Sequence, residues 1–254
     1  MNLQPYAVFL DIDGTLMAHG QIPQKNIDAI AAARSRGHKV YINTGRSYAC
    51  IPKYLLDAIE FDGIVAGVGS YIRYRDQVVH SLIIPQPLLS ETADYFVSKQ
   101  YACAFEGEEK MIYLNLQASK DFQNAYYMDK KNHFKSTYRD VRITKATVFG
   151  TLSDADHAYL KDSFVIYQHD HYAEIALKGC SKSVGMQRVL DDLSIGRQYS
   201  LAMGDSTNDL DMLTAAGISV AMGNATDEIK AVSNYITADV AAAGVAEALE
   251  KFLP

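Results

Sequence analysis

Two aspartates, Asp11 and Asp13, stand one residue apart directly after the apolar run Val-Phe-Leu at residues 8–10, and Gly14 follows them. This pattern predicts a buried strand that leads into a tight loop. Ligands of open α/β sheets bind beyond the carboxyl ends of the strands, so both carboxylates are expected at a binding site. One can hold a cation through its side chain, while the other offers a backbone oxygen or works as an acid and base. An aspartate-rich turn without chemistry is the structural alternative.

Polar residues also follow two other predicted strands. Thr44, Gly45 and Arg46 come after residues 39–43, and the acidic turn Gly-Asp-Ser-Thr-Asn-Asp at residues 204–209 comes after residues 199–203. Lys182 opens a predicted helix. A helix start directs backbone N–H groups outward, so the Thr44-Gly45 turn suits an anion. If these strands are parallel and adjacent, their ends lie along one edge of the sheet and bring these residues together.

The carboxylates of this set define the chemistry that it can support. Four of them without a cation would repel one another, and at least one would have to stay protonated. A hard divalent ion resolves the repulsion, and Mg²⁺ prefers a few carboxylate oxygens and bridges to phosphate. A lysine, a threonine and a glycine complete a site for a phosphoryl group, and an aspartate can be its nucleophile. No G-x-S-x-G elbow and no Walker-type loop occurs, which argues against a serine hydrolase and a P-loop enzyme.

The elements that must position these residues alternate between strand and helix at both ends of the chain. Before residue 70 the pattern predicts a strand ending at residue 10, a helix at 23–36, a strand at 39–43, a helix at 48–59 and a strand at 63–67. After residue 181 it predicts helices at 182–193, 209–216, 226–232 and 245–252, and strands at 199–203, 218–222 and 235–237. This order predicts an α/β fold, with a doubly wound, mostly parallel, Rossmann-like core sheet.

The middle of the chain follows another pattern. Residues 70–84 resemble a hairpin, with strands at 71–74 and 78–79. Beyond it we expect helices at 87–99, 119–131 and 154–161, and strands at 101–106, 110–115, 144–149, 164–169 and 172–177. Apolar and polar residues alternate more clearly in these strands than in those of the core, which is typical of a sheet with one exposed face. The predicted organisation is therefore a core made of residues 1–84 and 181–254, with an α+β cap inserted at residues 85–180.

Composition excludes several other classes of protein. The 254 residues are 48% hydrophobic and 21% charged, with a formal net charge of −6, so a general nucleic-acid binder is not expected. No signal peptide and no membrane-length apolar run is apparent, and no obligate protein partner is evident. Three widely spaced cysteines suit a reduced, cytoplasmic protein. The pair in His169-Asp170-His171 has a spacing that could suit a metal, but a turn between two strands explains it better.

The motifs together resemble the haloacid dehalogenase-like superfamily of phosphatases, in particular its Cof-like sugar-phosphatase branch. Residues 11–15, Asp-Ile-Asp-Gly-Thr, resemble the first motif, and residues 44–46 the second. Lys182 resembles the third, and residues 204–209 the fourth; Val-Ala-Met-Gly-Asn-Ala at residues 220–225 is also typical of that branch. The four motifs occur in the expected order, with a cap-sized insert after the second.

The resemblance implies a role for each motif residue. Asp11 is the implied nucleophile and a magnesium ligand, and Asp13 the acid and base that also ligates Mg²⁺ through its backbone oxygen. Asp205 is the third protein ligand, and Asp209 orients a water bound to the metal rather than touching the metal itself. The phosphate oxygens are held by the Ile12 N–H, Thr44, Gly45, Lys182 and Asn208. Taken singly, Thr44 also suits a helix cap, Asp209 a first-turn charge and Lys182 a solvated side chain.

Two segments depart from the family pattern. The family commonly has Asn-Gly-Ala after its third core strand, where this chain has Val68-Gly69-Ser70. Residues 240–245, Val-Ala-Ala-Ala-Gly-Val, lack the asparagine and acids that relatives carry near the C-terminus. Neither change removes a residue with an implied role in phosphoryl transfer.

These observations predict a magnesium-dependent phosphomonoesterase that hydrolyses a small phosphorylated metabolite through an aspartyl-phosphate, with a sugar phosphate as the favoured substrate class. Two alternatives stay open: a phosphomutase with the same motifs, and a phospho-aspartate signalling module that stores the phosphate. Glu174 is a candidate for binding sugar hydroxyls, although a plain strand-edge carboxylate also explains it. Tyr71, Arg73 and Glu106 are candidates of the same kind.

Overall fold

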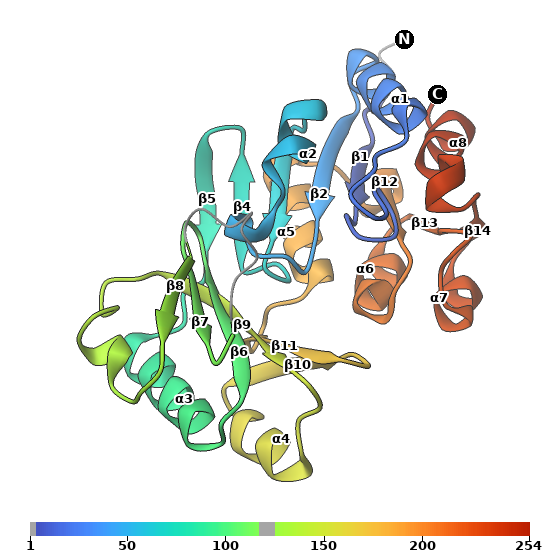
Figure 1. The fold of residues 1–254 in the computed structure, drawn as a ribbon. Helices are drawn as coiled ribbons and strands as arrows, with labels where there is room; N and C mark the ends of the chain where they lie inside the picture. The colour runs from blue at the N-terminus through green and yellow to red at the C-terminus, as the bar shows by residue number, and fades with distance from the viewer. Residues whose placement is uncertain (1–3, 117–124) are drawn as a thin grey trace. The chain divides into compact units, whose positions relative to one another are not determined.

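The structure is a computed structural model that describes residues 4–116 and 125–254. The chain forms two compact units (Figure 1). The first comprises residues 1–45, 51–79 and 181–254, and the second comprises residues 46–50 and 80–180. Residues 46–50 and 80–84, which the sequence analysis placed in the core, thus belong to the second unit. The reason is visible in their contacts: the Ile84 N–H donates to the Ile143 carbonyl at 2.8 Å, and Cys50 packs on Met111.

The first unit is built on an eight-stranded sheet with the order β14-β13-β12-β1-β2-β3-β4-β5. Its six parallel strands are β1 (Ala7–Leu10), β2 (Lys39–Asn43), β3 (Gly63–Ala66), β12 (Ser200–Gly204), β13 (Ile218–Ala221) and β14 (Tyr235–Ile236). Two further strands, β4 (Tyr71–Tyr74) and β5 (Gln77–Ser81), complete it, with β4 antiparallel to β3. The predicted mostly parallel, doubly wound core is confirmed.

Six α-helices of the described residues belong to the first unit. They are α1 (Gln24–Ser35), α2 (Lys53–Ala58), α5 (Lys182–Leu193), α6 (Leu210–Ala215), α7 (Asp227–Val232) and α8 (Gly244–Phe252). Contacts join α1 to α8, and α6 to both α5 and α7. Right-handed crossovers that run in opposite directions from the central strands place these two sets on opposite faces. The predicted helix at 48–59 is interrupted, because Pro52 adopts an extended backbone before α2 and leaves a separate turn at Tyr48–Cys50.

Helix α5 carries Lys182 in its first turn. The Ser181 hydroxyl accepts a hydrogen bond from the Val184 N–H at 3.2 Å, which caps the helix start. Met186, Val189 and Leu190 form its buried face at helical spacing. Gly185 lets the helix approach β3, because a Cβ there would lie 2.4 Å from Cγ1 of Val65. Lys182 is consequently fixed at the carboxyl edge of the sheet.

The second unit holds a six-stranded sheet with the order β10-β11-β9-β6-β7-β8. Its strands are β6 (Ala102–Gly107), β7 (Met111–Leu114), β8 (Ala125–Met128), β9 (Ile143–Phe149), β10 (Phe164–Gln168) and β11 (Tyr172–Leu177). Helices α3 (Gln86–Ser98) and α4 (Asp154–Leu160) contribute to an apolar core that includes Phe96 and Phe105. This α+β unit matches the predicted architecture of the insert.

One predicted element of the insert is wrong where the structure describes it. The sequence analysis expected a helix at 119–131. The first part of this range, residues 119–124, lies outside the described part of the chain. Residues 125–128 form β8, which pairs in parallel with β7. Tyr126 and Tyr127 favour an edge strand, where bulky rings fit the pleated surface. His169 and His171 lie in the connection between β10 and β11, as the turn interpretation expected.

No helix within residues 4–116 and 125–254 combines the length and the apolar character needed to span a bilayer.

The close contact of α5 with β3 gives a test of the core packing. Gly185→Ala improves helix propensity by about 1 kcal/mol, yet its methyl group meets Val65 at 2.4 Å and Gly69 Cα at 3.1 Å. Overpacking costs about 1–3 kcal/mol, so the clash is expected to outweigh the propensity gain. Urea unfolding should show a lower free energy of unfolding for Gly185→Ala. The exposed α5 control Gln187→Ala should change it little, and a Gly185→Ala variant more stable than the wild type would contradict the packing.

Candidate active site

The site begins at the carboxyl edge of three neighbouring strands. β1 lies between β2 and β12, and Leu10 pairs with both Ile42 and Met203. The next residue of each strand or of the loop after it is therefore at the same level, which brings Asp11, Asn43 and Gly204 side by side. The Asp11 N–H continues the ladder by donating to the Met203 carbonyl at 3.2 Å. Sequence segments far apart in the chain thus meet at one edge, as predicted.

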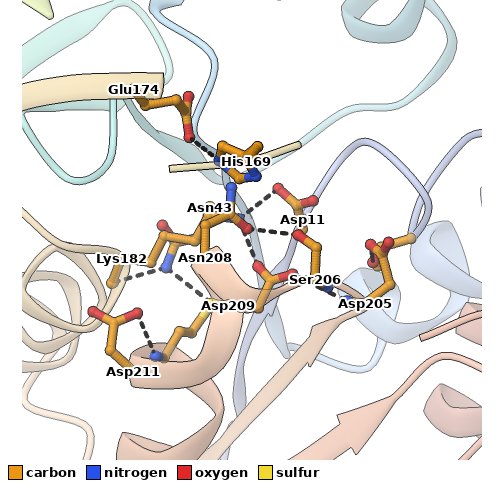
Figure 2. Close-up of polar contacts among 12 residues, drawn as sticks. Asp11, Asn43, His169, Glu174, Lys182, Asp205, Ser206, Asn208, Asp209 and Asp211 are labelled. Carbon is orange, nitrogen blue, oxygen red and sulfur yellow. Dashed lines mark hydrogen bonds and ion pairs between the residues drawn. The ribbon is translucent and has the colours of Figure 1, made fainter. Parts of the chain in front are cut away.

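The Lys182 ammonium is the centre of the site (Figure 2). Its Nζ donates to Asp11 Oδ1 at 2.8 Å, to Asp209 Oδ1 at 2.5 Å and to Asn208 Oδ1 at 3.4 Å. Lys182 and Asp209 are fully buried, and Asp11 is 5% exposed. These contacts bring together the residues predicted for the first, third and fourth motifs, and they exclude the interpretation of Lys182 as a solvated lysine.

Asp209 has a structural role besides its contact with Lys182. Its Oδ2 accepts hydrogen bonds from the N–H groups of Asp205 at 3.0 Å and Ser206 at 3.1 Å, and it forms a capping box with Ser206. Gly204 leaves the room for this carboxylate, since a Cβ there would lie 2.4 Å from Asp209 Cγ. Asp209 therefore holds the shape of the 204–209 turn while it shares the ammonium of Lys182.

Asp205 is held by the loop that follows β1. The Thr15 hydroxyl donates to Asp205 Oδ1 at 3.0 Å. Gly14 has a φ of +77°, and a Cβ there would lie 2.3 Å from Asp205 Oδ2. Only glycine combines this left-handed backbone with the close approach of a carboxylate. The glycine of the first motif therefore makes room for the aspartate of the fourth.

Two carboxyl groups of the site, those of Asp11 and Asp205, have raised pKa values. Burial raises the pKa of Asp11 to about 8; Lys182 opposes the rise, and Asp209 and Asp205 add to it. Burial and the charge of Asp209 raise the pKa of Asp205 to about 7. Although burial opposes the charged form of Lys182, Asp11 and Asp209 raise its pKa. The site thus keeps a permanent ammonium but disfavours a full set of carboxylate charges.

The same three acids fit a divalent cation. Oxygen atoms of Asp11, Asp205 and Asp209 lie within 4.8 Å of one another, the one such metal-competent group within residues 4–116 and 125–254. Burial, with the nearby charge of Asp209, raises the pKa of both Asp11 and Asp205, so a cation beside them would favour their ionised forms. Hard oxygen donors of this kind suit Mg²⁺, so the residues present fit the predicted metal.

The remaining predicted residues lie around this centre. Asp13 is exposed in the turn after β1, close enough to Asp205 to contribute to its raised pKa. The Ile12 carbonyl closes that turn by accepting from the Leu16 and Met17 N–H groups at 3.0 Å. Thr44 and Gly45 are buried beyond the end of β2, and the Thr44 N–H donates to the Val65 carbonyl at 2.9 Å.

Several residues that support the site received no role in the sequence analysis. The Asn43 side chain donates to the Lys182 carbonyl at 2.9 Å, and the Ser183 N–H donates to Asp211 at 3.1 Å. The Ser206 hydroxyl donates to Asn208 Oδ1 at 2.8 Å, and Thr15 fixes Asp205. Asn43 could have been noticed as a polar residue at the end of a predicted strand. The other contacts join segments that lie apart in the chain, and they leave no local signal in the sequence.

The residues proposed for sugar recognition fall in different places. Arg73 pairs with Asp76 at 3.0 Å in the hairpin, and Tyr71 is buried in β4 of the first unit. Glu106 and Glu174 are buried in the second unit and lie near Lys145.

The two departures from the family pattern both contain a left-handed residue. In the segment after β3, Val68 has a φ of +56°, a conformation that strains a β-branched residue. In the C-terminal segment, the Val240 N–H donates to Asn224 Oδ1 at 2.8 Å, and Ala243 has a φ of +63°.

Comparisons with known proteins agree with this geometry. A family model for haloacid dehalogenase-like hydrolases matches residues 8–249. The chain is 28% identical over 275 residues to a 5-amino-6-(5-phospho-D-ribitylamino)uracil phosphatase of Bacillus subtilis (strain 168), covering 99% of both proteins. It is 26% identical over 251 residues to phosphoglycolate phosphatase 1 of Saccharolobus solfataricus, covering 97% of this chain and 95% of that protein.

Solved structures show the same relationship. A sugar phosphatase of haloacid dehalogenase subclass IIB superposes with a TM-score of 0.83 at 27% identity, covering 97% of this chain and 98% of the other. With the family model spanning nearly the whole sequence and the motif residues gathered around Lys182, the chain belongs to the haloacid dehalogenase-like hydrolase family.

Proposed function

We propose that this protein is a magnesium-dependent phosphomonoesterase that hydrolyses a small phosphorylated metabolite, with a sugar phosphate as the favoured class. The observation that carries the proposal is the fully buried Lys182 ammonium, 2.8 Å from Asp11 and 2.5 Å from Asp209 at the carboxyl edge of the sheet. Phosphoryl transfer depends on positioning and charge neutralisation, which this arrangement provides. The relatives named above are phosphatases of small phosphorylated compounds, and one structural neighbour is a sugar phosphatase.

In the first step, an Asp11 carboxylate oxygen attacks phosphorus and forms an O–P bond, while the bond from phosphorus to the leaving oxygen breaks. Asp13 gives its proton to that oxygen, so the product leaves as a neutral alcohol. Lys182 holds the Asp11 carboxylate in place and stabilises negative charge on the phosphoryl oxygens. The N–H of Ile12, together with Thr44, Gly45 and Asn208, completes the hydrogen bonds to those oxygens.

In the second step, water attacks phosphorus and Asp13 takes up the proton of that water. The bond between phosphorus and Asp11 breaks, inorganic phosphate leaves, and both carboxyl groups return to their starting states. Asp11, the backbone carbonyl of Asp13 and Asp205 would hold Mg²⁺, with Asp209 beside them, and this ion would neutralise charge on the phosphoryl group. The cycle releases free phosphate, which distinguishes it from a mutase and from a stored phosphate.

The nucleophile is tested by Asp11→Asn, which keeps the shape of the side chain but removes its charge. We expect this variant to fold and to lose phosphate release by at least about a thousandfold, because the covalent step has no substitute. A phosphate-release assay with a panel of sugar phosphates measures the loss. Asp28→Asn, an exposed position on α1, is the matched control and should retain activity. Full turnover by Asp11→Asn would refute the assignment.

The role of Asp13 as the acid is tested by comparing the loss of activity in Asp13→Ala for substrates with a poor and a good leaving group. An alkyl alcohol needs a proton to leave, whereas p-nitrophenolate does not, so hydrolysis of a sugar phosphate should fall by roughly a hundredfold or more. Hydrolysis of p-nitrophenyl phosphate should fall much less. Steady-state kcat for the two substrates gives the comparison, and equal losses would contradict the role of Asp13 as the acid.

The metal is tested through stability and pH. The folded pKa values of Asp11 and Asp205, about 8 and about 7, lie above the ordinary 3.8, so the folded protein binds more protons than the unfolded chain over that interval. Without metal, the free energy of unfolding should therefore fall as pH rises towards about 8. Removal of the metal with a chelator should abolish activity. Mg²⁺ binds the ionised carboxylates, so it should raise the melting temperature more at about pH 8 than at about pH 6. An equal effect of Mg²⁺ at both pH values would count against this cluster as the metal site.

A further inference from the structure

The segment Val-Ala-Met-Gly-Asn-Ala at residues 220–225 has no step in the proposed reaction. It comprises the last residues of β13 and the loop that leads to α7. The Met222 N–H donates to the Gly204 carbonyl at 3.0 Å, and the Thr226 N–H, one residue beyond the segment, donates to the Asp205 carbonyl at 3.1 Å. This loop therefore lies at the carboxyl edge of the sheet, beside the turn that carries Asp205.

The side chain of Asn224 joins this loop to two other segments of the first unit. Its Nδ2 donates to the Gly14 carbonyl at 2.8 Å, and its Oδ1 accepts from the Val240 N–H at 2.8 Å. Asn224 is exposed, so burial of its amide group does not explain why both ends of the amide are paired within the protein. The contact with Gly14 connects the loop after β13 to the loop that carries Asp11 and Asp13.

Gly14 is a position where this second loop needs support. The residue has a φ of +77°, and the Asp205 carboxylate leaves no room for a Cβ there. Glycine loses more conformational freedom on folding than any other residue, so its backbone has to be fixed by hydrogen bonds. The Gly14 N–H donates to the Met17 carbonyl at 2.9 Å within the loop, and its carbonyl accepts from Asn224. Asn224 thus supplies a bond from outside the loop to the backbone directly after Asp13.

The backbone of Gly14 also determines where Asp13 lies. The two residues share a planar peptide unit, so rotation about the backbone bonds of Gly14 would turn this unit and move the Asp13 side chain with it. An acid must lie about 2.6–3.2 Å from the oxygen that it protonates. A displacement of about 1 Å can lower a rate by about a hundredfold. A contact that fixes Gly14 can therefore control proton transfer from Asp13.

We propose that Asn224 is a positioning residue for Asp13, because its hydrogen bond to the Gly14 carbonyl holds the acid at the leaving oxygen of the substrate. This inference rests on the phosphatase function proposed above. Asn224 acts through Asp13 and takes no part in proton transfer itself. Its loss should therefore matter most for substrates whose leaving group needs a proton.

The first test compares two leaving groups in Asn224→Ala with Mg²⁺ present. The alkyl substrate is whichever sugar phosphate, or phosphoglycolate, the wild type hydrolyses fastest, and the aryl substrate is p-nitrophenyl phosphate. We expect kcat to fall by about tenfold for the alkyl substrate and to stay within about twofold for the aryl substrate, whose leaving group needs no proton. Equal losses would overturn the inference. A wild-type protein that hydrolyses no alkyl phosphate would instead contradict the proposed function, so the two failures are distinguishable.

Asn234→Ala is the matched control. Asn234 is another exposed asparagine of the first unit, and its Oδ1 accepts from the Ser219 N–H at 2.9 Å. Ser219 lies near the start of β13, away from the carboxyl edge of the sheet. The control variant loses a similar hydrogen bond and should leave the ratio of the alkyl to the aryl kcat at the wild-type value. The same result for Asn224→Ala would show a merely structural role.

Asn224→Asp separates the two hydrogen bonds of Asn224. An aspartate can still accept from the Val240 N–H, but it cannot donate to the Gly14 carbonyl. The added charge acts on the phosphate group that both substrates share, so the ratio of the two kcat values remains the readout, and it should fall as in Asn224→Ala. A wild-type ratio would overturn the inference. This variant also gives the test if Asn224→Ala does not fold.

A double variant tests whether Asn224 acts through Asp13. In the Asp13→Ala background the acid is absent, so adding Asn224→Ala should change the ratio of the two kcat values by less than about twofold. A further fall of about tenfold would show that Asn224 acts independently of Asp13 and would overturn the inference.

Hydrogen exchange followed by mass spectrometry gives a readout that does not depend on turnover. Peptides that cover residues 11–18 should exchange faster in Asn224→Ala than in the wild type, because the loop has lost its outside support. Asn234→Ala should leave their exchange unchanged. Unchanged exchange of these peptides in Asn224→Ala would contradict the positioning role.

Discussion

The buried ammonium of Lys182 is the interaction on which the site depends. It is shared by Asp11, from the loop after the first strand, and by Asp209, from the turn after β12. Removing one member of such a buried pair typically costs about 3–5 kcal/mol, because the other charge stays behind without a partner. The same contacts set the chemistry, since Lys182 holds the proposed nucleophile while burial and the surrounding acids keep the pKa of Asp11 high. Fold stability and reactivity are therefore joined in one cluster.

The parallel sheet makes this convergence possible. Adjacent parallel strands end at one edge, so β1, β2 and β12 deliver residues that lie far apart in the chain to the same level. Close approaches complete the site: Gly14 admits the Asp205 carboxylate, Gly204 admits Asp209, and Gly185 admits β3 against α5. These glycines are needed because any side chain at their positions would occupy the space of a neighbour.

Much of the fold and of the motif cluster could be predicted from the sequence, and the misses have physical causes. Apolar periodicity gave β2 and α5 with their observed bounds, since both elements bury a regular face. Polar residues at the ends of the predicted parallel strands indicated that Asp11, Lys182 and Asp205 would meet. The helix expected at 119–131 is wrong at residues 125–128, where pairing with β7 decides the structure. Asn43 contacts helix α5, and Lys145 forms ion pairs with residues of neighbouring strands. These partners lie far apart in the chain, so no local pattern encodes them.

The central claim is that the carboxylate beside Lys182 receives the phosphoryl group. In the most direct measurement, the protein is mixed with Mg²⁺ and a sugar phosphate that it hydrolyses, and the reaction is quenched in acid during turnover. Peptide mass spectrometry then locates the modified residue. The account predicts an acyl phosphate on Asp11 that forms and decays fast enough to sustain the release of free phosphate. A phosphoryl group on another residue, or turnover with no phosphorylated protein at any quench time, would contradict it.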